Sequence, residues 1–124
     1  MRTINLYTVQ MARWRKVKAA GLTILDTTVK SGHREVAPTW DMVMGHKAGT
    51  VSDEEYVRQY KLLLDRSLRE NQDWWVNLLQ SEILVLGCYC RADGFCHRYI
   101  LKDVIKQQCQ LQGIHVIDMG EFYG

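Results

Sequence analysis

The sequence predicts an α/β fold: a three-layer, flavodoxin-like or Rossmann-like domain with a short, mostly parallel sheet of about four strands. Four short runs at 4–8, 22–26, 82–88 and 114–118 are rich in branched apolar residues, which is typical of strands. Segments with helical periodicity separate these runs, and strands joined through helices are expected to be parallel. The 124 residues fit one domain, 1–124, with a single core.

The first two strands and the helix between them are expected to form a βαβ unit. After the strand at 4–8, Met11, Trp14 and Val17 recur at helical spacing, which predicts a helix over 10–20 that stops at Gly21. The second strand, 22–26, follows directly. Segment 29–51 shows no clear period and is expected to be a loop, in which Trp40 either caps the core or belongs to a lid over a ligand.

The second half of the chain is predicted to begin with a helix whose start is a capping box, Ser52 to Glu55. A shorter helical piece with Trp74 and Trp75 follows. The run 82–88 has no polar alternation, as expected of a strand buried on both faces. The helix over 99–111 should bury Cys109 in the core, and the strand 114–118 leads to a tail, 120–124.

Composition excludes several classes of protein. The fractions of hydrophobic and charged residues, 47% and 24%, are ordinary for a globular protein, and a net charge of +2 gives no argument for nucleic acid binding. No apolar run approaches the roughly 20 residues of a membrane span. Four cysteines without a secretory signal favour a reducing setting, so the expected location is the cytoplasm of a bacterial cell or an infected host cell.

The stretch from Cys88 to Arg98 holds three cysteines, one histidine and two arginines within a loop between a strand and a helix. In open α/β sheets, ligands bind at the carboxyl ends of the strands. Polar residues of the other strand ends and of the following loop should gather there too. The residues expected to bind a ligand are Tyr7, Thr8, Gln10, Asp26, Thr28, Lys30, Trp40, Cys88, Cys90, Cys96, His97 and Arg98.

Three interpretations of this loop remain open. As an anion site, the helix start at Cys96 would bind a phosphate or carboxylate, with His97 and Arg98 adding hydrogen bonds and charge. As a reactive-thiol site, Cys96 would be a nucleophile activated by the helix terminus. The anion site is the most economical of the three, because it needs no covalent chemistry.

The third interpretation is a metal site. Cys88, Cys90, Cys96 and His97 form a C-x-C-x5-C-H pattern, which supplies enough ligands for tetrahedral zinc. The spacing differs from the usual C-x2-C knuckle, and adjacent Cys96 and His97 would point in different directions on a first helical turn. No cofactor is therefore expected, with zinc at these four residues as the alternative.

Cys88-Tyr-Cys followed by Phe95-Cys-His-Arg98 resembles the signature of the family catalogued as domain of unknown function 488. Leu6-Tyr-Thr-Val-Gln10 and Leu25-Asp-Thr-Thr28 resemble that family's first two strands. The resemblance covers about 4–105 and implies a three-layer α/β fold with a ligand pocket at the strand ends. Ala37-Pro-Thr-Trp40 together with Cys-Tyr-Cys is similar to compact versions carried by bacteriophages and prophages.

The predicted function is binding of a small anionic, nucleotide-derived ligand at the carboxyl edge of the sheet. One form of this function would be sequestration, by a phage, of a signal used in host defence. One alternative is a hydrolase or transferase that acts on a nucleotide, nucleobase or glycosidic bond with Cys96, His97 and Asp26. Another is DNA binding through the basic helix Arg13 to Lys18, which the small net charge disfavours. No membrane partner is expected, and a homo-oligomer stays open.

Overall fold

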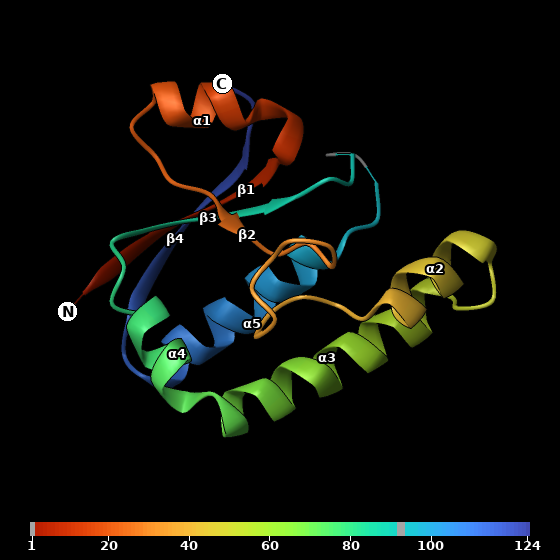
Figure 1. Cartoon of the computed structure of the whole chain (residues 1–124). Helices are drawn as coiled ribbons and strands as arrows, with labels where there is room; N and C mark the ends of the chain where they lie inside the picture. Colours follow the sequence, from red (N-terminus) through yellow and green to blue (C-terminus); the bar gives the residue numbers. More distant parts are fainter. Residues whose placement is uncertain (1, 92–93) are drawn as a thin grey trace.

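The computed structural model describes residues 2–91 and 94–124. These residues form four strands and five α-helices (Figure 1). The strands are β1 (Thr3–Gln10), β2 (Leu25–Asp26), β3 (Ile83–Cys88) and β4 (His115–Phe122). The helices are α1 (Trp14–Ala19), α2 (Trp40–Ala48), α3 (Asp53–Glu70), α4 (Gln72–Leu78) and α5 (His97–Leu111), and a short 3₁₀ helix, η1 (Met11–Arg13), precedes α1.

The four strands lie in the order β2-β3-β1-β4, and each neighbouring pair is parallel. This confirms the predicted α/β class. Gln10 of β1 pairs with Cys88 of β3, and Asp26 of β2 pairs with Gly87. The carboxyl ends of β1, β2 and β3 therefore meet at one edge of the sheet, as parallel topology requires.

Helices cover the two faces of the sheet unequally (Figure 1). α1 lies on one face, where Val9, Val17 and Val85 form a small apolar cluster. α3, α4 and α5 lie on the other face, over a larger core that includes Leu86 and Leu101. Because successive strand residues point to opposite faces, Cys88 projects on the same side as Leu86, toward α5.

The capping signal before α3 is confirmed. Ser52 Oγ accepts a hydrogen bond from Glu55 N at 3.1 Å, which satisfies one of the free N–H groups at the helix start. The Glu55 carboxylate does not complete the box, because it accepts hydrogen bonds from Arg58 and Gln59 instead. The predicted burial of Cys109 is also confirmed, since its exposed fraction is 0%.

Several predicted boundaries were wrong. The helix expected over 10–20 is a 3₁₀ turn followed by six helical residues, because β1 extends to Gln10. The strand expected over 22–26 is reduced to two residues, because β2 is an edge strand that pairs with β3 only at Leu86 and Gly87.

The loop predicted over 29–51 contains helix α2. Thr39 Oγ caps its start by accepting from Met42 N, and Gly49, with a φ of 80°, ends it. Met42 is the one buried residue in the helix, so its apolar residues show no amphipathic period. None of the helices in residues 2–91 and 94–124 is long and apolar enough to cross a membrane.

The predicted tail at 120–124 is mostly strand. β4 continues to Phe122 through an irregularity in its pairing with β1, where Leu6 faces Asp118 but Tyr7 faces Gly120. Gly120 has a φ of 74°, which a bulge of this kind requires and which glycine adopts without strain. The bulge places Glu121 opposite Thr8, on the α5 side of the sheet.

Candidate functional site

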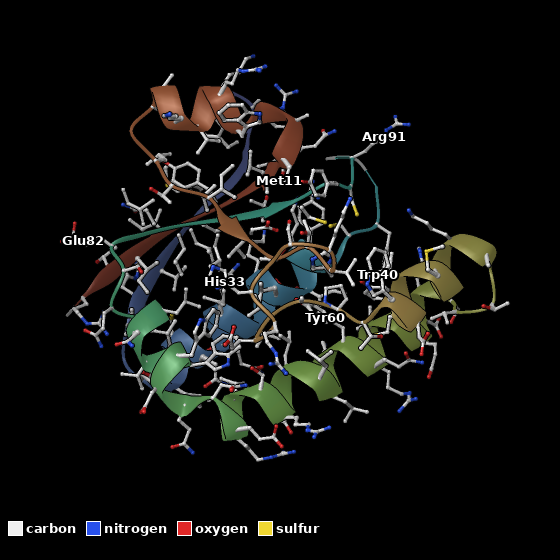
Figure 2. All side chains as sticks on the ribbon, viewed as in Figure 1. Met11, His33, Trp40, Tyr60, Glu82 and Arg91 are labelled. Carbon is white, nitrogen blue, oxygen red and sulfur yellow. The ribbon has the colours of Figure 1, made fainter. Side chains whose placement is uncertain are left out.

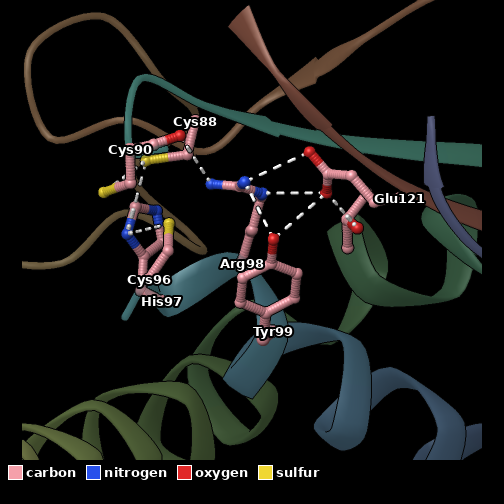
Figure 3. Close-up of polar contacts among 8 residues, drawn as sticks. Cys88, Cys90, Cys96, His97, Arg98, Tyr99 and Glu121 are labelled. Carbon is pink, nitrogen blue, oxygen red and sulfur yellow. Dashed lines mark hydrogen bonds and ion pairs between the residues drawn. The ribbon is translucent and has the colours of Figure 1, made fainter. Parts of the chain in front are cut away.

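The cysteine loop is held by two rigid elements. β3 ends at Cys88, and α5 begins at His97 with Cys96 as its N-cap residue. Cys88, Cys96 and His97 are each less than 5% exposed, whereas Cys90 is half-buried. Figure 3 shows the three sulfur atoms gathered around the His97 ring. The expectation that adjacent Cys96 and His97 would point in different directions was wrong, because Cys96 Sγ lies 3.9 Å from His97 Nδ1.

A pocket of about 460 Å³ lies in front of this cluster. We call it the thiol pocket. Its described lining residues come from the loop after β2, from α2, from α3 and from the cysteine loop; they are Thr28, Val29, Lys30, Trp40, Val43, His46, Lys47, Tyr56, Cys88, Tyr89, Cys90, Arg91, Phe95, Cys96 and His97. Figure 2 labels Trp40 on α2 and Arg91 on the loop after β3, which are two of the segments that border the pocket.

Two aromatic contacts support one wall of the pocket. The His46 ring stacks on Phe95 with a centroid separation of 4.6 Å, and Tyr56 packs edge-on against Phe95 at 5.2 Å. His46 Nε2 also forms a hydrogen bond with the Asp53 carboxylate at the start of α3. These contacts join α2, α3 and the cysteine loop into one wall.

His97 has a defined orientation and a defined tautomer. Its Nε2 lies 2.8 Å from Thr27 O and 3.0 Å from Thr27 Oγ. Because a carbonyl oxygen only accepts, Nε2 carries the proton and donates it, which leaves Nδ1 unprotonated. Burial lowers the pKa of His97, against the opposing effect of the hydrogen bond to Thr27, and this favours the neutral imidazole.

The Nδ1 of His97 faces sulfur atoms. It lies 3.7 Å from Cys88 Sγ and 3.9 Å from Cys96 Sγ, and Cys88 Sγ lies 3.6 Å from Cys90 Sγ. Because the three thiols are neighbours, a negative charge on one of them opposes ionisation of the other two. Hydrogen bonds from the Cys88 and Cys96 thiols lower the pKa of Cys90, and the same hydrogen bonds raise the pKa values of Cys88 and Cys96.

Arg98 lies outside the thiol pocket. Its side chain is fully buried, and its Nη2 forms an ion pair with Glu121 Oε2 at 3.2 Å (Figure 3). Arg98 also donates to Cys90 O and to the Tyr99 hydroxyl. Thr8 donates to the same Glu121 carboxylate at 2.6 Å. The Arg98 charge is thus neutralised inside the protein, between β4 and the start of α5.

Seven of the twelve residues predicted to bind a ligand line the thiol pocket: Thr28, Lys30, Trp40, Cys88, Cys90, Cys96 and His97. The other five do not line it. Tyr7 packs against Phe122 on the α1 side, Thr8 and Arg98 bind Glu121, and Gln10 pairs with Cys88 in the sheet. Asp26 shapes the neighbouring turn, as described below. Sequence reasoning missed the contributions of His46 and Lys47 because it missed α2, and it assigned no site role to Tyr56 or Phe95.

The Asp26 carboxylate organises the loop after β2. Its Oδ1 accepts a hydrogen bond from Thr28 N at 2.9 Å, and its Oδ2 accepts one from Ser31 Oγ at 2.7 Å. Burial opposes ionisation, but the hydrogen bonds from Thr28 and Ser31 outweigh it and lower the pKa of Asp26 below its ordinary value of 3.8. Both carboxylate oxygens therefore bind the turn that carries Thr28 and Lys30 to the pocket.

We predict that Asp26→Asn destabilises the protein in a pH-dependent way. A carboxyl group whose pKa falls on folding stabilises the native state above its ordinary pKa, and that contribution is lost as the pH falls through the folded-state value. After allowance for solvent screening, the loss should be about 1 kcal/mol at neutral pH and should shrink below roughly pH 4. Urea unfolding at neutral and acidic pH measures this loss of stability.

The control is Asp103→Asn, at an exposed position. A loss of stability in Asp26→Asn that does not change with pH would contradict the prediction.

Comparison with known proteins identifies the family of the chain. A model described as DUF488-N3a, the Active DUF488-N3 subclade, matches residues 7–109. Searches of curated proteins and of solved structures gave no significant match. The matched range runs from β1 through most of α5 and includes the whole cysteine loop. The chain therefore belongs to the DUF488 family, through its Active DUF488-N3 subclade.

Proposed function

We propose that this protein binds a small anionic ligand, a nucleotide or a nucleotide-derived metabolite, in the thiol pocket. The observation that carries the proposal is the make-up of the pocket's described lining. It combines three cationic side chains and two exposed aromatic rings, and none of its described members is acidic.

The charges at the pocket favour an anion. Lys30, Lys47 and Arg91 line it, and within the described ranges neither Lys30 nor Lys47 has a carboxylate within 4 Å. The positive charge of Lys30 and Lys47 is therefore not balanced by a close ion pair within the described ranges and would attract a phosphate. Arg98 is neutralised by Glu121, so we assign the anion contact to Lys30 and Lys47 rather than to Arg98.

The aromatic side chains favour a planar group in the same ligand. Trp40 is 54% exposed and Tyr89 is 65% exposed, although both are large rings that would gain from burial. Trp40 comes from α2 and Tyr89 from the loop after β3. Stacking of a nucleobase on such a ring contributes about 1–3 kcal/mol.

The volume of the pocket suits this ligand class. Small-molecule sites commonly measure about 300–1,000 Å³, and the thiol pocket, at about 460 Å³, falls in the lower half of that range. Binding alone would serve a protein that sequesters a nucleotide signal. If a phage carries this gene, such a protein would remove a host defence signal without any turnover.

Calorimetric titration of a panel of mononucleotides, cyclic nucleotides and ADP-ribose tests the proposal. We expect at least one member to bind, and we expect Trp40→Ala to weaken its affinity by roughly 10- to 100-fold, the equivalent of one stacking contact. Lys47→Ala should weaken it by a smaller factor that decreases as salt is added.

Matched controls lie on α1, at the opposite face of the sheet. Trp14 is an exposed tryptophan, and Lys18 is an exposed lysine. Trp14→Ala and Lys18→Ala should leave the affinity unchanged. Absence of binding across the panel, or equal losses for the Trp14 and Trp40 variants, would refute the proposal.

A second candidate function is that of an enzyme, a hydrolase or transferase acting on a nucleotide, nucleobase or glycosidic bond. Two observations favour it: the description of the family model calls the subclade active, and the pocket wall contains thiols next to the unprotonated Nδ1 of His97. Cys96 would then be the nucleophile and His97 its base, with Asp26 acting through the turn that it holds. Recovery of the bound ligand intact after incubation would favour binding; turnover that His97→Asn abolishes would favour the enzyme.

A further inference from the structure

Four potential metal ligands converge at the carboxyl end of β3. They are Cys88 at the end of the strand, Cys90 in the loop, Cys96 at the N-cap of α5 and His97 in its first turn. Adjacent residues on a helical turn would point apart, but Cys96 is not helical. Its backbone is extended, with a φ of −155° and a ψ of 143°, and this turns its side chain toward the His97 ring.

Three of the distances between the donor atoms match the edges of a tetrahedral site. Zinc–sulfur and zinc–nitrogen bonds of about 2.3 and 2.0 Å at tetrahedral angles place ligand atoms roughly 3.5–3.8 Å apart. Cys88 Sγ lies 3.6 Å from Cys90 Sγ and 3.7 Å from His97 Nδ1, and Cys96 Sγ lies 3.9 Å from His97 Nδ1. The donor atoms of Cys88, Cys96 and His97 all lie within 4.8 Å of one another, and Cys90, which is outside this group, adjoins it through its contact with Cys88 Sγ.

His97 is oriented as a metal-binding histidine is. Its Nε2 proton is donated to Thr27 O, so the lone pair on Nδ1 points at the sulfur atoms. Thr27 is itself fixed, because its Oγ donates to Gly87 O at 2.8 Å. This second layer of hydrogen bonds is independent of the thiols, and it already sets the tautomer that zinc needs.

The surroundings also suit a buried metal. Tyr60, which is fully buried, packs edge-on against the His97 ring at 5.5 Å and helps to close off the inner side of the cluster. Three thiols in contact, none of them in a disulfide, are the soft ligands that zinc prefers.

We propose that Cys88, Cys90, Cys96 and His97 bind one zinc ion in a tetrahedral Cys₃His site that forms the floor of the thiol pocket. On zinc binding, the thiols lose their protons to solvent, and the zinc ion links the end of β3 to the start of α5. The inference does not depend on the nucleotide proposal, because metal content and nucleotide binding are measured separately.

The test starts from the full chain, purified without chelator and with a reductant that contains no thiol. Native mass spectrometry and elemental analysis should find one zinc ion per chain. After removal of zinc, titration with Co²⁺ should produce the intense visible bands of a tetrahedral cobalt site together with near-ultraviolet sulfur-to-cobalt charge transfer. Added zinc should then displace the cobalt.

Variants show which residues hold the metal. Cys90→Ser, at a half-buried position, should retain the fold, weaken zinc affinity by more than roughly 100-fold and reduce the charge-transfer intensity. Cys109→Ser is the matched control, because Cys109 is a buried cysteine elsewhere on α5, and its zinc affinity should match that of the wild type.

Three results would overturn the inference: a reduced wild-type chain that is free of zinc and gives no cobalt spectrum, a disulfide between Cys88 and Cys90 in the freshly purified protein, or full zinc affinity in Cys90→Ser. The last of these would exclude the four-ligand site even if a metal is bound.

Discussion

Glu121→Ala should destabilise the protein by about 3–5 kcal/mol, a large part of the stability of a domain of this size. The Arg98 side chain is 0% exposed and the Glu121 side chain is 8% exposed, so the pair is shielded from water. Loss of the carboxylate leaves a buried guanidinium without its counter-charge and removes the acceptor that Thr8 and Tyr99 also use. Urea-induced unfolding, followed by circular dichroism, measures the loss.

The matched control is Glu70→Ala. Glu70 pairs with Arg66 on the surface of α3, where both side chains are more than half exposed, so its loss should cost less than about 1 kcal/mol. The double variant Arg98→Met with Glu121→Leu should recover part of the stability, because it removes both buried charges together. Equal costs for the Glu121 and Glu70 variants would show that the buried pair has no special role.

This ion pair also marks a limit of what the sequence predicts. The sequence predicted that Arg98 is a cation available to a ligand and that 120–124 is a tail after the last strand. The bulge at Gly120 changes both interpretations, because it lets β4 continue and aims Glu121 at Arg98, 23 positions away. Such a contact depends on strand register, which local residue patterns do not specify.

The gathering of site residues was more predictable. Parallel strands bring their carboxyl ends to one edge, so Cys88, Asp26 and the start of α5 could be placed together from element order alone. Their individual roles were not. Asp26 turns its carboxylate into the loop after β2, and only side-chain geometry reveals that.

The helix α2 was missed for a different reason. Its sequence has no apolar stripe, because it packs on the rest of the protein mainly through Met42 while Trp40 and Met44 stay exposed. Periodicity detects helices that bury one face. The caps at Thr39 and Gly49 were the available signal, and they would have placed Trp40, His46 and Lys47 on one helix beside the site.

Gly32→Ala should be the second large loss, because Gly32 lies where the loop after β2 folds back on itself. A Cβ atom there would lie 2.5 Å from Thr28 O and 2.7 Å from Asp26 O, and closer still to Thr28 N. These are backbone atoms, and two of them already bind the turn, in the bonds from Gly32 N to Thr28 O and from His33 N to Asp26 O. They cannot move aside without breaking the Asp26 turn, so we expect a loss of about 3 kcal/mol or more.

The same substitution should also weaken any ligand of the thiol pocket, since Thr28 and Lys30 reach the pocket from this turn. Gly87→Ala offers a graded comparison: its Cβ would meet the side chains of Ile24 and Met11, which can shift, so its cost should be smaller. Gly94→Ala is the control, because among residues 2–91 and 94–124 a Cβ there meets only Arg91 O, at 3.7 Å, and its stability should stay within about 0.5 kcal/mol of the wild type. If Gly32→Ala unfolds at the same urea concentration as Gly94→Ala, the turn tolerates a side chain and does not position the pocket.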